Sequence, residues 1–261
     1  MALHMLDPLP CVDRGDLDKA RQLVEEIFLE EMKYPGSPLN PGMVKLNLDH
    51  TDRVRANAVA IAAGEGLNLP LMELAAILHD VSKIDHRDLV SGGIDTWHHH
   101  HRGASLARKL ILANLPSAVA VADVVSQMIE CHSDIPFIRR YWAGQYRASL
   151  PGPRTKEEFA LRDADVIDML WVAGMAKIVY FRQVPGSDFY LEDGGDIQRA
   201  IASAHSSFRE ALGCLVTPTS KKLAKGRVSL VKKFFSRLRC VRTLEEFIRE
   251  YDFFVNEQQG A

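Results

Sequence analysis

The sequence has few cysteines and no long apolar run, and each shortage excludes a class of protein. The four cysteines (Cys11, Cys131, Cys214 and Cys240) are too widely spaced for the disulfide framework of a small secreted domain. No stretch approaches the roughly 18 uninterrupted apolar residues of a membrane span. The N-terminus also lacks the basic and apolar segments of a secretory signal. We therefore expect a soluble, cytoplasmic protein with reduced thiols and no membrane contact.

Net charge and strand-like patterning are also scarce. The formal net charge is −2, which gives no general attraction to nucleic acid or to a membrane surface. Apolar and polar residues rarely alternate as they do in a half-buried strand, whereas helical spacing recurs along the chain. The 261 residues, 47% of them hydrophobic, are enough to bury one large core. The sequence predicts an all-α, single-domain fold.

Loop signals divide the chain into a series of expected helices. We expect helices over about 17–28, 45–63, 70–80, 99–115, 118–131, 156–180, 196–212, 221–238 and 243–255. The longest connections, 133–155 and 183–196, are expected to shape specificity, because long loops in compact domains often form lids or substrate walls. We expect a core over 44–180, an N-terminal helical extension over 1–43, and C-terminal helices over 181–261 that pack on the core.

Several polar side chains fall on the apolar faces of these helices. His50 shares a face with Val54 and Ile61, and His79 shares one with Leu78 and is followed directly by an aspartate. The others on apolar faces are His132 and Asp165. A single inward histidine usually bonds a carbonyl, but burying five polar groups without compensation would cost several kcal/mol each. One shared metal site would compensate for all of them.

Three motifs resemble the signature of the HD superfamily of phosphohydrolases. They are L-x-H-x-x-R-V-x-x-x-A (residues 48–58), A-A-I-L-H-D-V-S-K (residues 75–83) and A-D (residues 164–165), and the resemblance spans about residues 44–180. It implies that His50, His79, Asp80 and Asp165 bind one divalent metal. Mixed imidazole and carboxylate ligands suit Mn, Fe, Ni, Co or Zn.

Many members of this superfamily have two further histidines between the HD pair and the last aspartate. His99 and His132 stand where these would be expected, so the resemblance implies a site for one or two metals in which Asp80 would bridge a pair. The run from His98 to His101 leaves the register open, with His100 or His101 as the next choices. Asp163 and Asp168 are expected to support the ligands, or else to form structural ion pairs.

Basic residues provide the expected contacts with substrate. We expect catalysis to depend on Asp80 and on Lys83, whose ammonium would neutralise a phosphoryl oxygen. Arg102, Arg139 and Arg140 are possible phosphate clamps, although each alone could be ordinary surface charge. The segment 221–242 has nine basic residues and no acidic one. Apolar residues interleave with them at helical spacing, which favours a solvated helix face over a nucleic-acid site.

The function implied by the resemblance is metal-dependent hydrolysis of a phosphate ester by metal-activated water. The expected substrate is a nucleotide or another small phosphomonoester. One alternative is a di-iron oxygenase that cleaves a C–C or C–P bond, because some relatives use the same ligand order for that chemistry. Another is a regulatory module that binds a metal and a nucleotide. Lys83 favours phosphate chemistry, while the oligomeric state is left open.

Overall fold

The computed structural model describes residues 12–34, 41–83, 99–133, 152–183 and 196–259. Every regular element within these ranges is helical, which confirms the predicted all-α fold. The elements are, in order, α1 (Arg14–Met32), α2 (Pro41–Glu65), α3 (Leu69–Leu78), α5 (His99–Asn114), η1 (Pro116–Val121), α6 (Ala122–Cys131), α8 (Lys156–Met169), α9 (Val172–Phe181), α10 (Ile197–Cys214), α11 (Pro218–Arg237), η2 (Leu238–Cys240) and α12 (Leu244–Gln259). Most of each loop expected at 133–155 and 183–196 lies outside the described residues.

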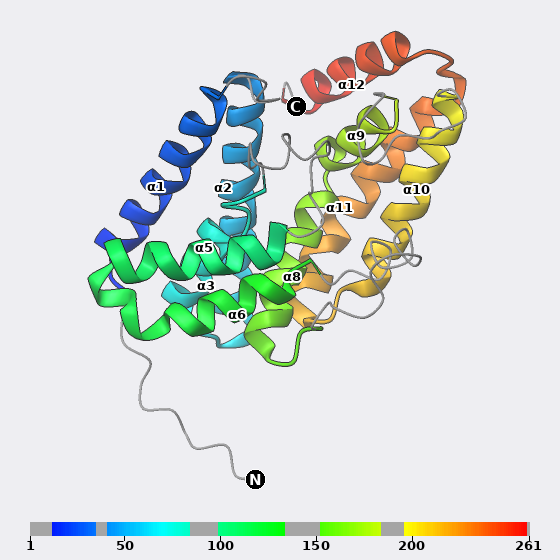
Figure 1. Cartoon of the computed structure of the whole chain (residues 1–261). Helices are drawn as coiled ribbons and strands as arrows, with labels where there is room; N and C mark the ends of the chain where they lie inside the picture. Colours follow the sequence, from blue (N-terminus) through cyan, green and yellow to red (C-terminus); the bar gives the residue numbers. More distant parts are fainter. Residues whose placement is uncertain (1–11, 35–40, 84–98, 134–151, 184–195, 260–261) are drawn as a thin grey trace.

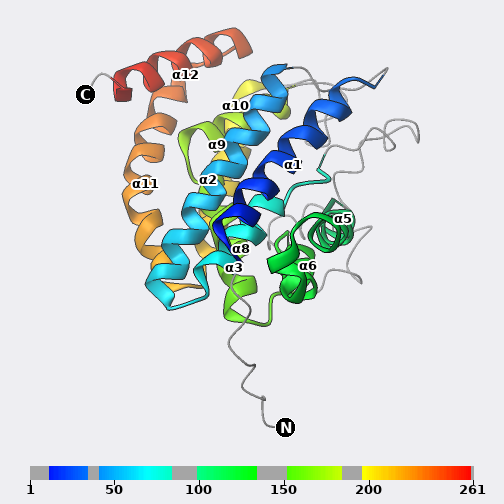
Figure 2. The same ribbon diagram turned by 90° about the vertical axis from the view of Figure 1, so that its left-hand side faces the viewer.

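Helices α2, α3 and α8 pack together at the centre, and other helices cover them. Helix α1 lies along α2 and α3, while α5 and α6 form a pair that packs on α3 and α8 (Figure 1). Figure 2 shows the α5–α6 pair end-on beside this central group. The core includes the fully buried side chains of Ile61, Leu74, Ile111 and Leu161. Burial of this apolar surface is the main force that holds the helices together.

Local capping fixes where two of the central helices begin. The side chain of Asn68 accepts a hydrogen bond from the backbone N–H of Leu71 at 3.0 Å, and Pro70 occupies the first turn of α3. Thr155 and Glu158 form a reciprocal capping box at the start of α8. With these starts fixed, α3 ends at Leu78, directly before His79 and Asp80, and α8 places Asp165 in its third turn.

The single helix predicted over 156–180 is wrong, because the structure breaks it into α8 and α9. Gly174 permits the break, since a Cβ there would lie 2.6 Å from the carbonyl oxygen of Met169. Arg227 of α11 stabilises the junction from the side. Its guanidinium donates to the carbonyl of Ile167 at 2.6 Å and lies 4.4 Å from the centre of the Trp171 ring. The break depends on a tertiary contact that helical periodicity does not reveal.

The C-terminal helices pack on the outer side of α8 and α9. Val231 and Phe234 of α11 are buried, whereas its lysines lie on the exposed side: Lys221, Lys222, Lys225, Lys232 and Lys233. Helix α12 lies across the far end of α11, where Arg237 forms ion pairs with Glu250 and Glu257 (Figure 2). Among the described helices, none combines the length and the hydropathy that crossing a membrane requires.

Candidate metal centre

The structure brings the predicted ligands together from five helices or helix ends. His50 comes from the middle of α2, and His79 and Asp80 follow the last turn of α3. His99 begins α5, His132 caps the C-terminus of α6, and Asp165 lies in α8. His79 and His132 are almost fully buried, with exposed fractions of 0% and 1%. The burial inferred from their apolar faces is therefore correct.

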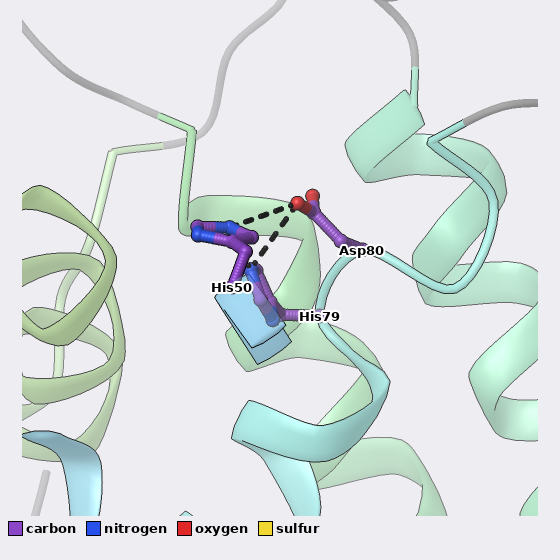
Figure 3. Close-up of side chains that lie close together, drawn as sticks. All are labelled: His50, His79 and Asp80. Carbon is purple, nitrogen blue, oxygen red and sulfur yellow. Dashed lines mark hydrogen bonds and ion pairs between the residues drawn. The ribbon is translucent and has the colours of Figure 1, made fainter. Parts of the chain in front are cut away.

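One half of the cluster surrounds the Oδ2 atom of Asp80. His50 Nε2 lies 3.2 Å from this oxygen, and His79 Nε2 lies 3.4 Å from it (Figure 3). The two imidazole nitrogens are themselves 3.3 Å apart. Asp165 closes this half, with its Oδ1 atom 3.4 Å from His50 Nε2 and 4.0 Å from His79 Nε2. Four donor atoms thus converge on one small space.

The other half surrounds the Oδ1 atom of Asp80. His99 Nε2 lies 3.4 Å from it and His132 Nε2 lies 3.7 Å from it. The two oxygens of one carboxylate therefore face two different pairs of imidazoles. Three overlapping groups of residues could each hold an ion: His50, His79 and Asp80; His79, His132 and Asp165; and Asp80, His99 and His132. Within each group, the donor atoms lie within 4.8 Å of one another. This arrangement offers space for one or two ions.

The hydrogen bonds of the histidines determine their tautomers, and therefore which ring nitrogen presents a lone pair to the cluster. His79 Nδ1 lies 2.8 Å from the carbonyl oxygen of Ala76, and His132 Nδ1 lies 2.5 Å from that of Ile129. A carbonyl can only accept, so both Nδ1 atoms carry a hydrogen. In the neutral ring Nε2 then carries no hydrogen, and its lone pair can bind a metal.

These facts satisfy the requirements of a bound cation. Lone pairs of His50 and His79 that face one another at 3.3 Å repel unless a positive charge lies between them or on one of them. The Oδ1 atom of Asp80 is buried and has no hydrogen-bond partner among the described residues. Such an orphaned acceptor is costly in an apolar interior and is satisfied by an ion. Imidazole and carboxylate donors together suit divalent transition metals.

Opposite charges outweigh burial in setting the pKa values of the cluster. Burial alone would raise the pKa of Asp80, but Lys83 and His79 hold it well below its ordinary value. Burial lowers the pKa of His79, yet the Asp80 carboxylate raises it overall. Burial likewise opposes the charge on Lys83, while the same carboxylate raises its pKa. Asp80 is therefore ionised, as a carboxylate that binds a metal must be.

Asp168 supports the cluster from behind His50. Its Oδ2 atom lies 2.8 Å from His50 Nδ1, and its Oδ1 atom accepts from Arg53 Nε at 2.6 Å. Burial would raise the pKa of Asp168, but the hydrogen bonds from His50 and Arg53 lower it to about 2. An ionised carboxylate can only accept, so His50 also presents its Nε2 lone pair to the cluster.

Asp163 matches the structural alternative of its prediction, because its Oδ1 atom forms an ion pair with Arg162 Nη2 at 3.1 Å. Its fully buried carboxylate accepts hydrogen bonds from the backbone N–H groups of Val216 and Thr217 at 3.0 and 2.8 Å. The hydroxyls of Thr217 and Ser220 donate to the same oxygen at 2.9 and 2.7 Å. Asp163 thus anchors the start of α11, because α8 turns this side chain away from the face that carries Asp165.

The histidine run has a clear geometry among its described members. His99 faces Asp80, whereas His101 Nδ1 hydrogen-bonds Glu130 at 2.9 Å, and His100 is buried beside both rings. His98 lies outside the described residues, as do Arg139 and Arg140. Arg102 lies on α5, partly buried, one turn after His99, and its contact with a substrate stays a prediction. Lys83 is 26% exposed and contacts Asp80 Oδ2.

Sequence reasoning missed Lys177 and the contribution of Arg53. Lys177 is the one charged residue of α9, whose sequence VAGMAKIVYF is otherwise apolar or small. Burial and the nearby Lys83 lower its pKa to about 8, against the opposing effect of Asp80 and Asp168. A lone lysine in an apolar helix was the available signal. For Arg53 the signal was its place one helical turn after His50.

Comparisons with known proteins agree with this fold and site. The HD domain family matches residues 47–170, which include all six predicted ligand positions. No curated protein sequence matches the chain significantly. Among solved structures, Bacillus subtilis YpgQ is similar at 20% identity with a TM-score of 0.52, over 86% of this chain and 94% of that chain. The same protein in complex with ADP gives 19% identity and a TM-score of 0.51, over 86% and 93%.

A third similar structure is that of an HD-superfamily hydrolase from Bacillus thuringiensis. It is 17% identical with a TM-score of 0.51, and the match covers 86% of this chain and 95% of that chain. These identities are low, so the structures support the fold, while the family match rests on the domain that carries the cluster. Residues 47–170 belong to the HD domain family, and this segment carries the whole cluster.

Proposed function

We propose that this protein is a metal-dependent hydrolase that cleaves a phosphate ester of a small molecule. The observation that carries the proposal is the position of Lys83. Its ammonium contacts Asp80 Oδ2, and its side chain is 26% exposed, so the residue lies at the edge of the buried cluster. An ammonium is a compact point charge that suits a phosphoryl oxygen.

A second lysine, Lys177, belongs to the electrostatic surroundings of the cluster. Its pKa is influenced by Lys83, Asp80 and Asp165. Two lysines near a site that also holds divalent metal would create a strongly positive environment. Such an environment favours an anionic substrate over a neutral one, which supports phosphate chemistry over oxygenation of a C–C bond.

The residues that would hold metal are those of the cluster. His50, His79, Asp80 and Asp165 would hold one ion, and His99 and His132 would hold a second that shares Asp80. When bound, a divalent metal makes water more acidic and neutralises charge on the phosphoryl group. The chain itself contributes the orientation of the imidazoles, through Asp168 and the carbonyls of Ala76 and Ile129, and the positive charge of Lys83.

Within phosphate esters, we propose a nucleotide as the first substrate class to test. Bacillus subtilis YpgQ, which has the same fold, was solved with ADP. The phosphate of a nucleotide would meet Lys83. The metal, the number of ions and the nucleotide are all parts of this proposal.

The test measures phosphate release by metal-depleted protein after anaerobic reconstitution with Mn, Fe, Co, Ni or Zn. The substrates are nucleoside mono-, di- and triphosphates together with a generic aryl phosphate. His99→Ala and His101→Ala form a matched pair, because these neighbours differ in facing Asp80 or Glu130. We expect metal-dependent release that His99→Ala abolishes and His101→Ala retains.

Two other results would contradict the proposal. Two bound irons with oxygen consumption and no phosphate release would identify an oxygenase. Nucleotide binding without turnover in any metal form would identify a regulatory module.

A further inference from the structure

Ser133 has an unusual position directly after a predicted metal ligand. It follows His132 at the end of α6, and it is 8% exposed. Its Oγ atom lies 3.1 Å from His99 Nε2 and 3.2 Å from His132 Nε2. A hydroxyl has one hydrogen, so it cannot donate to both nitrogens. The hydroxyl thus stands between the two imidazoles that face Asp80 Oδ1.

The donor atoms around this point have the separations that one ion requires. Two donors at right angles, each about 2.1 Å from an ion, lie about 3.0 Å apart, and tetrahedral donors lie about 3.4 Å apart. The separations of Ser133 Oγ from the two imidazole nitrogens, 3.1 and 3.2 Å, fall in this range. Those of Asp80 Oδ1 from His99 and His132, 3.4 and 3.7 Å, correspond to wider angles.

We propose that Ser133 Oγ is an additional oxygen donor to the second metal, alongside His99, His132 and Asp80. This inference rests on the proposed two-metal site and deepens it. A neutral hydroxyl oxygen is a hard donor, and it raises the number of protein ligands from three to four. The oxygen donor favours Mn²⁺ or Fe²⁺, which accept oxygen ligands readily, over Zn²⁺. Ser133 therefore contributes to the metal preference of this half of the cluster.

A purely structural serine would behave differently. If Ser133 only hydrogen-bonded an imidazole, its removal would change the stability of the α6 end, and the preference among metals would stay the same. Ser126 provides a matched control in the same helix. Its hydroxyl donates to the carbonyl of Ala104 at 3.0 Å, and it therefore has a structural hydrogen bond of ordinary kind.

The experiment measures Mn²⁺ and Zn²⁺ binding to metal-depleted wild type, Ser133→Ala, Ser133→Cys and Ser126→Ala, by equilibrium titration with the free ion quantified. For wild type and Ser126→Ala we expect two bound ions. Ser133→Ala should keep the first ion at unchanged affinity and bind the second Mn²⁺ about tenfold more weakly or worse. Ser133→Cys should shift the second half toward Zn²⁺ and Co²⁺, and bound Co²⁺ should show absorption from a thiolate ligand.

The alternative results separate this inference from the proposed function. If Ser133→Ala binds both ions with wild-type affinity and preference, Ser133 is not a ligand, and the hydrolase proposal stands. A wild-type chain that binds a single ion also overturns the inference. A wild-type chain that binds no ion overturns the inference and the proposed function together. Circular dichroism and thermal unfolding of each variant show whether a loss of binding reflects a loss of fold.

Discussion

The carboxylate of Asp168 forms a hydrogen bond with the imidazole of His50, with 2.8 Å between Oδ2 and Nδ1, although the two residues are 118 positions apart in the sequence. Arg53 binds the same carboxylate through Nε at 2.6 Å and Nη2 at 3.1 Å. The pair therefore belongs to a chain of contacts that runs from the partly exposed Arg53 to the buried cluster. Because Asp168 fixes both the tautomer and the ring plane of His50, it governs how well His50 binds a metal.

Loss of this carboxylate should weaken the first metal. In Asp168→Asn, the amide oxygen can still accept from His50, but the negative charge that makes the imidazole more basic is gone. We expect the affinity for the first ion to fall by about 10- to 100-fold, with the second ion less affected. Metal titration of Asp168→Asn and of Asp163→Asn tests this, because Asp163 contacts α11. Equal losses in the two variants would contradict the assignment.

The same residue should make the folded state sensitive to acid. The pKa of Asp168 is lowered from 3.8 to about 2 in the folded chain, so the folded state favours the carboxylate. The stability gained is fully present above about pH 4 and is lost as the pH falls toward 2, and its size is about 2 kcal/mol. Urea unfolding of metal-free wild type and Asp168→Asn between pH 6 and 2.5 measures the difference. The two stabilities should converge as the pH falls, and parallel curves would refute the prediction.

Replacement of Lys83 should reduce turnover while metal binding persists. Lys83→Met removes the ammonium but keeps most of the side-chain volume. We expect kcat/KM for a phosphate ester to fall on the order of 10²-fold, the effect of removing one charge-stabilising donor. Metal stoichiometry should stay at the wild-type value. Lys109→Met, at an exposed position of α5, is the control and should retain wild-type turnover. A variant of Lys83 that loses metal instead would indicate a structural role.

Asp163 should matter for stability and leave metal binding intact. Asp163→Ala leaves four donors of α11 and its preceding turn without their acceptor in a fully buried place. We expect a loss of about 3 kcal/mol in the free energy of unfolding, as for other broken buried polar networks. Asp196→Ala removes a cap with a single hydrogen bond, at an exposed position, and should cost about 1 kcal/mol. Urea denaturation compares the two variants, and similar losses would show that the network adds little.

The sequence was sufficient for much of the site because buried polar residues violate a local pattern. His50, His79 and His132 occupy helix faces that are otherwise apolar, and this periodicity predicts burial without any knowledge of the fold. The resemblance then brought His99 into the same prediction. Asp163 was less predictable, because a carboxylate on a buried helix can face a ligand or a neighbouring helix. Only the packing of α11 against α8 distinguishes the two.

The amino-acid sequence by itself determined the helical class and the residues that had to be buried, since both follow from spacing over one or two turns. The tertiary structure decided which histidine of the 98–101 run faces Asp80, because that choice depends on how α5 rotates as it packs against α6. It also decided the break between α8 and α9, through Gly174 and Arg227. The placement of Ser133 beside His99 joins residues 34 positions apart. Such relationships depend on the packing of distant helices, which local periodicity does not encode.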